Sequence, residues 1–185
     1  PLYTSYAEIH TAVERMRRLW ALQEPLDRVP ALVGVPWTSS RKADGSYFGN
    51  LDLYLAEQEA YWRHRSAIAD ETIPEVDPQY GHALISGLCG SPIRAESHTV
   101  WSVPVLDDLA RADDLRLDWD NAWGRRFRED YERLLEWAAG RCTVGDYEVE
   151  GVSDTMSALR GAERLCLDFH DDPDALRRFA RKVTD

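Results

Sequence analysis

Residues 142–149 read CTVGDYEV, and residues 150–176, directly after them, read EGVSDTMSALRGAERLCLDFHDDPDAL. The first stretch predicts a strand, and the second predicts a helix over about 154–169. Asp172-Pro173 is a capping residue followed by a first-turn proline, which predicts a last helix. Strands that alternate with helices are typical of an α/β fold with a parallel sheet, because parallel neighbours need helical crossovers. Doubly wound sheets and barrels both fit this order.

The alternation continues toward the N-terminus. The run Ala-Leu-Val-Gly-Val at 31–35 lies between two prolines, which is typical of a strand buried on both faces. A loop rich in turn-forming residues follows it. Asp118 or Asp120 is expected to cap a helix that ends at Gly140. Further segments are predicted from apolar spacing: helices at 5–23, 51–68 and 82–89, a short strand at 73–76, and one or two strands within 93–103.

Composition limits the partners of the chain. Its 185 residues fit one domain over 1–185. The 22 basic and 33 acidic side chains give a net charge of −11, which repels phosphate backbones and argues against nucleic acid. No apolar run approaches the roughly 18 residues of a membrane helix. Three widely spaced cysteines fit reduced thiols, so we expect a cytoplasmic protein with no membrane partner.

A few side chains have positions that favour a binding site. Trp37 directly follows the predicted strand at 31–35 and opens the long loop, where α/β folds make ligand contacts. Alternation puts Glu148 and Glu150 on one side of their strand, where they either share protons, hold a metal ion or face solvent. Asp154 is available as a helix cap. His82 lies in a loop-like setting, where it is a candidate general base or ligand.

The stretch 150–176 resembles a glycine, helix and Asp-Asp-Pro run of the uroporphyrinogen decarboxylase-like superfamily. Upstream, Ile73 to Gly81, followed by Leu88-Cys-Gly90 and Thr99-Val-Trp101, looks like the second-strand region of less-studied branches. The resemblance covers most of 27–185. It implies a (β/α)₈ TIM barrel with its active site at the C-terminal ends of the strands. Since such a barrel needs roughly 250 residues, we expect 1–185 to be its N-terminal part.

Members of this superfamily either decarboxylate a porphyrinogen without a cofactor or move methyl groups between corrinoid proteins and other acceptors, often with zinc. The resemblance therefore implies a small-molecule substrate, a corrinoid partner protein, and zinc ligands outside these residues. The decarboxylase branch carries an arginine-containing loop after its first strand, and this chain has Pro36-Trp-Thr-Ser-Ser-Arg41 there instead. A porphyrinogen carries many carboxylates and needs converging arginines. Methyl transfer is thus preferred, and porphyrinogen decarboxylation in tetrapyrrole biosynthesis is the alternative.

The candidate site residues follow from these considerations. Those expected to transfer protons or act as ligands are His82, Tyr147 and Glu148. Those expected to bind substrate are Trp37, Arg41, Tyr80, Trp101 and Asp154, with Trp37 and Tyr80 as walls and Arg41 holding an anionic group. No metal ligand is assigned. A further alternative is a non-catalytic half barrel that associates with itself, for example as a homodimer, to cover its open edge.

Overall fold

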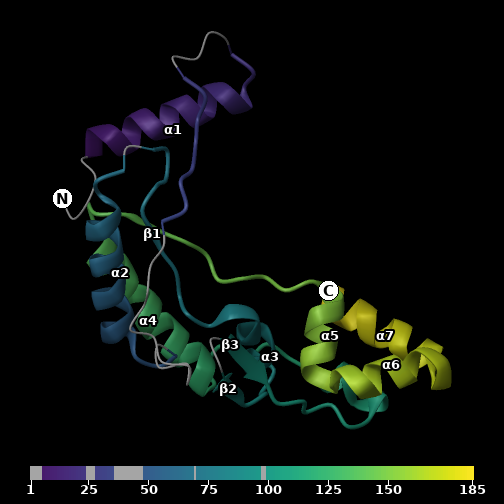
Figure 1. Ribbon diagram of the computed structural model, residues 1–185. Helices are drawn as coiled ribbons and strands as arrows, with labels where there is room; N and C mark the ends of the chain where they lie inside the picture. Colours follow the sequence, from purple (N-terminus) through teal and green to yellow (C-terminus); the bar gives the residue numbers. More distant parts are fainter. Residues whose placement is uncertain (1–5, 24–27, 36–47, 69, 97–98) are drawn as a thin grey trace. The chain divides into compact units, whose positions relative to one another are not determined.

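The computed structural model describes residues 6–23, 28–35, 48–68, 70–96 and 99–185, and it mixes helices with short strands (Figure 1), as the alternation predicts. Contacts divide the chain into two compact units. The first is drawn from 1–40, 50–77 and 132–145, and the second from 41–49, 78–131 and 146–185. The expectation of one domain stays a prediction. None of the described helices is long and apolar enough to cross a membrane.

The first unit contains one parallel strand pair, β1 with β4. The amide of Gly145 adds one hydrogen bond of 2.8 Å to the carbonyl of Val76. The pairing ends there because Asp77 is followed by Pro78, which has no N–H to extend the ladder. The predicted strand over 142–149 is therefore much shorter than expected. The elements of this unit are α1 Tyr6–Trp20, α2 Leu51–Arg65, β1 Glu75–Val76, the end of α4 Ala122–Ala138, and β4 Thr143–Val144.

The predicted buried strand over 31–35 is wrong. Val33 in this segment is 43% exposed, and the segment has no strand partner among the described residues. The amides of Ala31 and Val33 donate instead to the carboxylates of Glu71 and Asp70, each at 2.7 Å. Carboxylate oxygens thus accept the amide hydrogen bonds that the carbonyls of a neighbouring strand would otherwise accept. The segment is extended but exposed.

The second unit contains a β-hairpin, as the pattern over 93–103 predicts. Strand β2 (Ile93–Glu96) pairs antiparallel with β3 (Thr99–Ser102). The 3-10 turn η1 (Gly81–Ala83) and helix α3 (Leu84–Leu88) precede the hairpin and confirm the short helix predicted at 82–89. A small core packs around these elements. Its buried members are Tyr80, Ala83, Leu84, Leu88, Ile93 and Phe127. The described residues thus form two sheets of two strands each, and the barrel stays a prediction.

Helix α4 forms where it is predicted, but its cap is Asn121 and not Asp118 or Asp120. The Asn121 Oδ1 accepts hydrogen bonds of 2.8 and 3.0 Å from two amides of the first turn. Its Nδ2 donates at 3.0 and 3.1 Å to two carbonyls at the end of α3. A carboxylate has no donor for the second task, whereas an amide side chain caps one helix and ties it to another.

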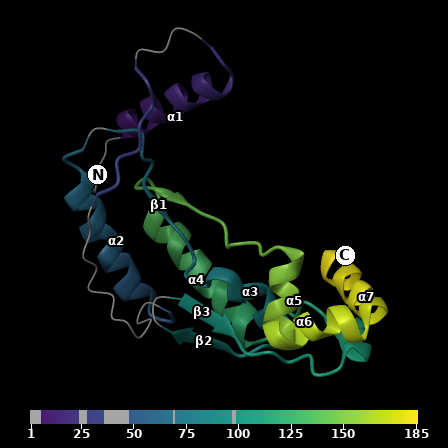
Figure 2. The same cartoon turned by 45° about the vertical axis from the view of Figure 1, so that its right-hand side comes forward.

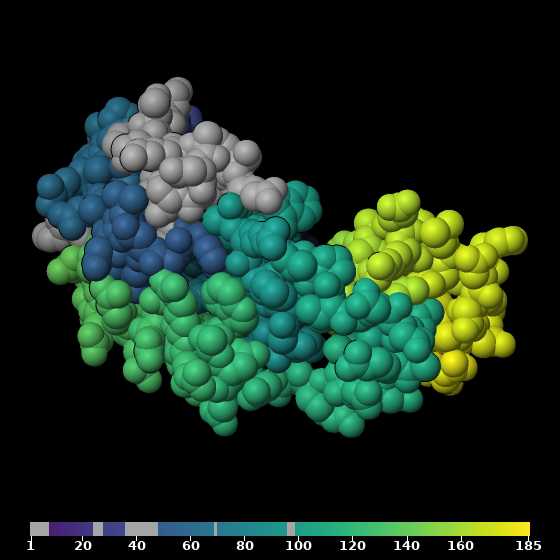
Figure 3. Space-filling view, turned by 90° about the horizontal axis from the view of Figure 1, so that it is seen from below, coloured from purple at the N-terminus to yellow at the C-terminus, as the bar shows by residue number. Residues whose placement is uncertain are grey.

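Three helices lie together at the end of the second unit, α5 Val152–Arg160, α6 Ala162–Asp171 and α7 Pro173–Thr184 (Figures 1 and 2). The single helix predicted over 154–169 is broken at Gly161, whose φ of +89° is one that L side chains rarely adopt. The start of α7 is as predicted, because the Asp172 carboxylate accepts from the amide of Ala175 at 3.0 Å. The 3-10 turn η2 (Leu109–Asp114) packs against α7 (Figure 3).

A buried ion pair spans the break between α5 and α6. The guanidinium of Arg160 donates two hydrogen bonds, of 2.7 and 2.9 Å, to the carboxylate of Asp168. Each of the two side chains is 11% exposed. Arg160 also donates to the carbonyls of Leu106 and Asp107, in the segment that follows β3. One side chain therefore holds two helices and a connecting segment together.

Replacing Asp168 by Asn is expected to lower the free energy of unfolding by about 3 kcal/mol, because it leaves the Arg160 guanidinium buried without its counter-charge. Urea unfolding followed by circular dichroism measures this change. Asp171→Asn is the matched control, since Asp171 is an exposed acid on the same helix. If the two variants unfold at the same urea concentration, the pair does not hold the helices as described.

Candidate functional site

A cavity of about 460 Å³ lies in the second unit, beside the β-hairpin and α5. Its volume is within the range of small-molecule sites. Three of the predicted site residues line it: His82 from η1, Trp101 from β3 and Asp154 from α5. Glu150 and two serines, Ser102 and Ser157, supply further polar groups. The structure therefore brings together side chains that are up to 75 positions apart in the chain.

The position of His82 depends on the residue before it. Gly81 has a φ of +48°, and a Cβ added there would lie 3.1 Å from the side chain of Val100. A side chain at this position would be strained, because L residues rarely adopt this backbone turn and the Cβ would press on Val100. The ring of His82 then stands next to Glu148, with 3.3 Å between Nδ1 and Oε2. Both side chains are mostly exposed, so this contact orients the ring more than it stabilises the fold.

Glu150 is the one strongly perturbed acid of the cavity. Burial is the largest of the effects that together raise the pKa of Glu150 to about 7. The charges of Asp154 and Glu148 also act to raise this pKa, and His82 acts to lower it. The hydroxyl of Thr155 also points at the carboxylate, with 3.5 Å between the oxygens. A carboxyl group with a pKa near neutrality can both donate and accept a proton at physiological pH.

The sequence gives only a partial indication of this role. The alternation of Glu148 and Glu150 predicts that they share one side, and it is compatible with shared protons, a bound metal ion or exposure to solvent. The two acids in fact differ, because Glu148 is exposed and Glu150 is half-buried. Asp154 is no helix cap: α5 begins at Val152 with Gly151 before it, and Asp154 lies in the first turn. A carboxylate in the first turn interacts favourably with the positive end of the helix dipole. The side chain of Asp154 also lines the cavity.

Tyr147 and Tyr80 lie in the aromatic core and are not among the described residues that line the cavity. Tyr147 packs edge-on against Phe127, with ring centroids 5.6 Å apart. The hydroxyl of Tyr80 donates to Asp130 at 2.9 Å. Burial and the Asp130 carboxylate raise the pKa of Tyr80 well above its usual value, so it stays a neutral phenol. A catalytic role for Tyr147 and a binding role for Tyr80 stay predictions, as do the roles of the other candidates.

Two predicted binding residues, Trp37 and Arg41, lie outside the described residues.

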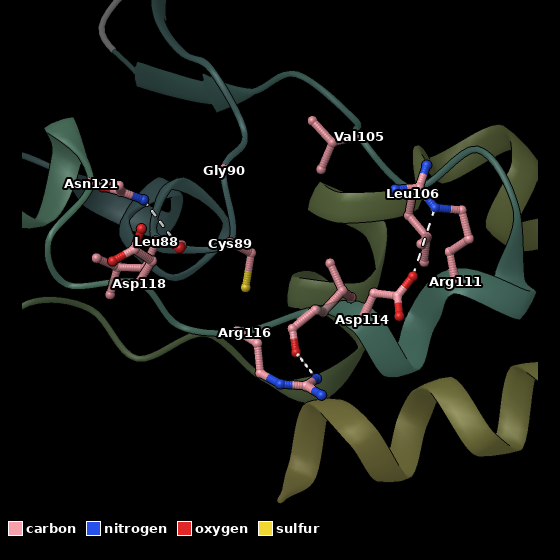
Figure 4. Close-up of a pocket in the computed structure, with 11 residues that line it drawn as sticks. Leu88, Cys89, Gly90, Val105, Leu106, Arg111, Asp114, Arg116, Asp118 and Asn121 are labelled. Carbon is pink, nitrogen blue, oxygen red and sulfur yellow. Dashed lines mark hydrogen bonds and ion pairs between the residues drawn. The ribbon is translucent and has the colours of Figure 1, made fainter.

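A second cavity, of about 360 Å³, contains the thiol of Cys89 (Figure 4). Burial raises the pKa of this thiol, which disfavours the nucleophilic thiolate. The arginines nearby have intramolecular partners, since Arg111 pairs with Asp114 at 3.9 Å and Arg116 donates to the carbonyl of Leu115 at 2.6 Å. None of the described residues that line this cavity is a histidine that could act as a base for the thiol. The cavity beside His82 is the better candidate.

Among the described residues, no three His, Cys, Asp or Glu side chains are grouped so that they could hold a metal ion. The zinc ligands implied by the superfamily resemblance are expected outside residues 1–185, and that expectation stays a prediction. Comparisons with family models, curated proteins and solved structures found no match. Fold and site together describe this protein as one of mixed helices and strands with an acidic cavity. The cavity combines a His-Glu contact with a carboxyl group of near-neutral pKa.

Glu150→Gln is expected to flatten the pH dependence of stability. The ordinary pKa of a glutamate is 4.5, so between about pH 5 and 7 the folded protein keeps a proton that the unfolded chain has lost. The free energy of unfolding of the native sequence therefore falls as the pH rises through this window. Because Glu150 is half-exposed and partly screened, we expect a decline of about 1 kcal/mol.

Urea unfolding at pH 5 and pH 8 measures this decline. Glu129→Gln is the control, because Glu129 is an exposed glutamate of α4. The native protein and the control should share the decline, and Glu150→Gln should lack it. A decline that persists in Glu150→Gln would assign the titration to another group.

Proposed function

We propose that the chain belongs to a barrel enzyme of the uroporphyrinogen decarboxylase-like superfamily, which transfers a methyl group from a small molecule to a corrinoid-bearing partner protein. The active site is the cavity beside His82. The observation that carries this proposal is the half-buried carboxyl of Glu150, with a pKa of about 7, in a cavity of small-molecule size. The parallel pair β1–β4, with α4 in its connection, supports the barrel, since helical crossovers join parallel strands.

The chemistry of the step requires a proton donor. When a methyl group leaves an oxygen or nitrogen atom, the bond between carbon and that atom breaks and the electron pair stays with the atom. The corrinoid of the partner would accept the methyl group. Glu150 donates its proton to the departing atom, and His82, held by Glu148 at 3.3 Å, returns a proton to Glu150. Because Glu150 acts as an acid, the rate falls above about pH 7.

The charge of the cavity favours methyl transfer over porphyrinogen decarboxylation. Glu150 and Asp154 both line the cavity. His82 is the one side chain among the described lining residues that can carry a positive charge. A porphyrinogen carries many carboxylates, and a cavity lined by acids repels them.

The test uses free cob(I)alamin as methyl acceptor, with a methyl aryl ether and a methylated amine as donors. We expect methylcobalamin to form, as followed by absorbance. Glu150→Gln should lower the rate by about 100-fold or more, because it removes the proton donor. Glu129→Gln should leave the rate unchanged. Release of CO₂ from a carboxylated tetrapyrrole, without methylcobalamin, would overturn methyl transfer in favour of decarboxylation. If neither methylcobalamin nor CO₂ forms, the proposal that this cavity is an active site is overturned.

A further inference from the structure

The cavity beside His82 has an excess of negative charge. Glu150 and Asp154 line it from one side, and Glu148 faces the one basic ring among its described lining residues. The chain as a whole carries −11, so its long-range field has the same sign as the cavity. Such a cavity attracts a cation and repels an anion.

Trp101 gives the same cavity an aromatic wall. It lines the cavity from β3 together with Val100 and Ser102, and it is 59% exposed. The face of an indole is the best aromatic surface for a cation. Trp101, Glu150 and Asp154 all line this one cavity, with the indole on β3 and Asp154 on α5.

We propose that the substrate of this cavity is an alkylated ammonium compound, held between the indole of Trp101 and the carboxylates of Asp154 and Glu150. This inference rests on the proposed function, because it names the substrate class of the same site. Carboxylates neutralise the charge on nitrogen, and the indole face covers its methyl groups, for which a carboxylate offers no hydrogen-bond partner.

The substrate class agrees with the chemistry of the step. In a quaternary ammonium donor the nitrogen is already charged, so the methyl group leaves without a proton and Glu150 acts only as a counter-charge. In an amine donor, the proton from Glu150 creates the ammonium, and the carboxylate left behind helps to hold it. The C–N bond then breaks, the electron pair returns to nitrogen, and a neutral amine leaves. The departing product loses its charge, which weakens its attraction to the cavity and favours release.

Binding of a cation is coupled to the proton on Glu150. The groups that act on this carboxyl are His82 from η1, Glu148 before it in the chain, and Asp154 and Thr155 from α5. A cation in the cavity favours the ionised form of Glu150, so protons compete with it. Because the pKa of Glu150 is about 7, affinity for the cation should rise by about fivefold from pH 6 to pH 8. In Glu150→Gln this rise should disappear.

The experiment compares choline with 3,3-dimethylbutan-1-ol, which has the same shape and no charge. Calorimetry on the full chain should give choline at least about tenfold tighter binding. Trp101→Leu and Asp154→Asn should each weaken choline binding by about fivefold or more, and Trp101→Phe should retain part of the affinity. Trp20→Leu is the matched control, since Trp20 is 80% exposed and belongs to α1. Asp113→Asn is the matched control for the carboxylate.

The outcomes separate this inference from the proposed function. Equal binding of the two compounds, or unchanged choline binding in both Trp101→Leu and Asp154→Asn, overturns the ammonium site. Methyl transfer that runs equally well from the neutral ether and from the ammonium donor also overturns it, while the proposed function stands. Selective choline binding without methylcobalamin from any donor supports the ammonium site and overturns methyl transfer.

Discussion

The guanidinium of Arg160 is the constraint on which the second unit depends. It joins the end of α5 to Asp168 of α6 and to the carbonyls of Leu106 and Asp107. Those carbonyls belong to the segment that continues from β3, so the ion pair fixes α5 relative to the hairpin. Helix α5 carries Asp154, and β3 carries Trp101. The amides of Val105 and Leu106 also donate to the carbonyl of Leu159, each at 2.9 Å, so the ion pair and these backbone hydrogen bonds together hold the two sides of the cavity.

The chemistry of the cavity depends on unequal exposure of similar groups. Glu148 and Glu150 are two residues apart, yet only Glu150 is half-buried, and burial is the largest influence on its pKa. Burial thus distinguishes Glu150 from its neighbour and brings the pKa of Glu150 near neutrality. Different burial gives them different positions in the proposed site, with the exposed Glu148 beside the ring of His82 and the half-buried Glu150 as the proposed proton donor.

Local patterns predicted most of the helices, and non-local contacts account for the errors. The apolar stripe of α4 and the Asp172-Pro173 start of α7 depend on neighbours within a turn or two, and both are confirmed. The segment 31–35 has the composition of a buried strand, but the carboxylates of Asp70 and Glu71 take its amide hydrogen bonds. Asp70 and Glu71, about 40 positions further along the chain, decide that outcome. A prediction made from neighbouring residues does not take them into account.

The sequence by itself determined the positions of most helices, the acidic charge and three of the side chains that line the cavity, His82, Trp101 and Asp154, because these follow from residue type and local spacing. Only the tertiary structure decided that these three meet, that Tyr80 and Tyr147 turn into the aromatic core, and that Glu150 is the perturbed acid. The physical reason is that burial and distance between elements set desolvation and electrostatic coupling, and neither is a property of a residue and its sequence neighbours.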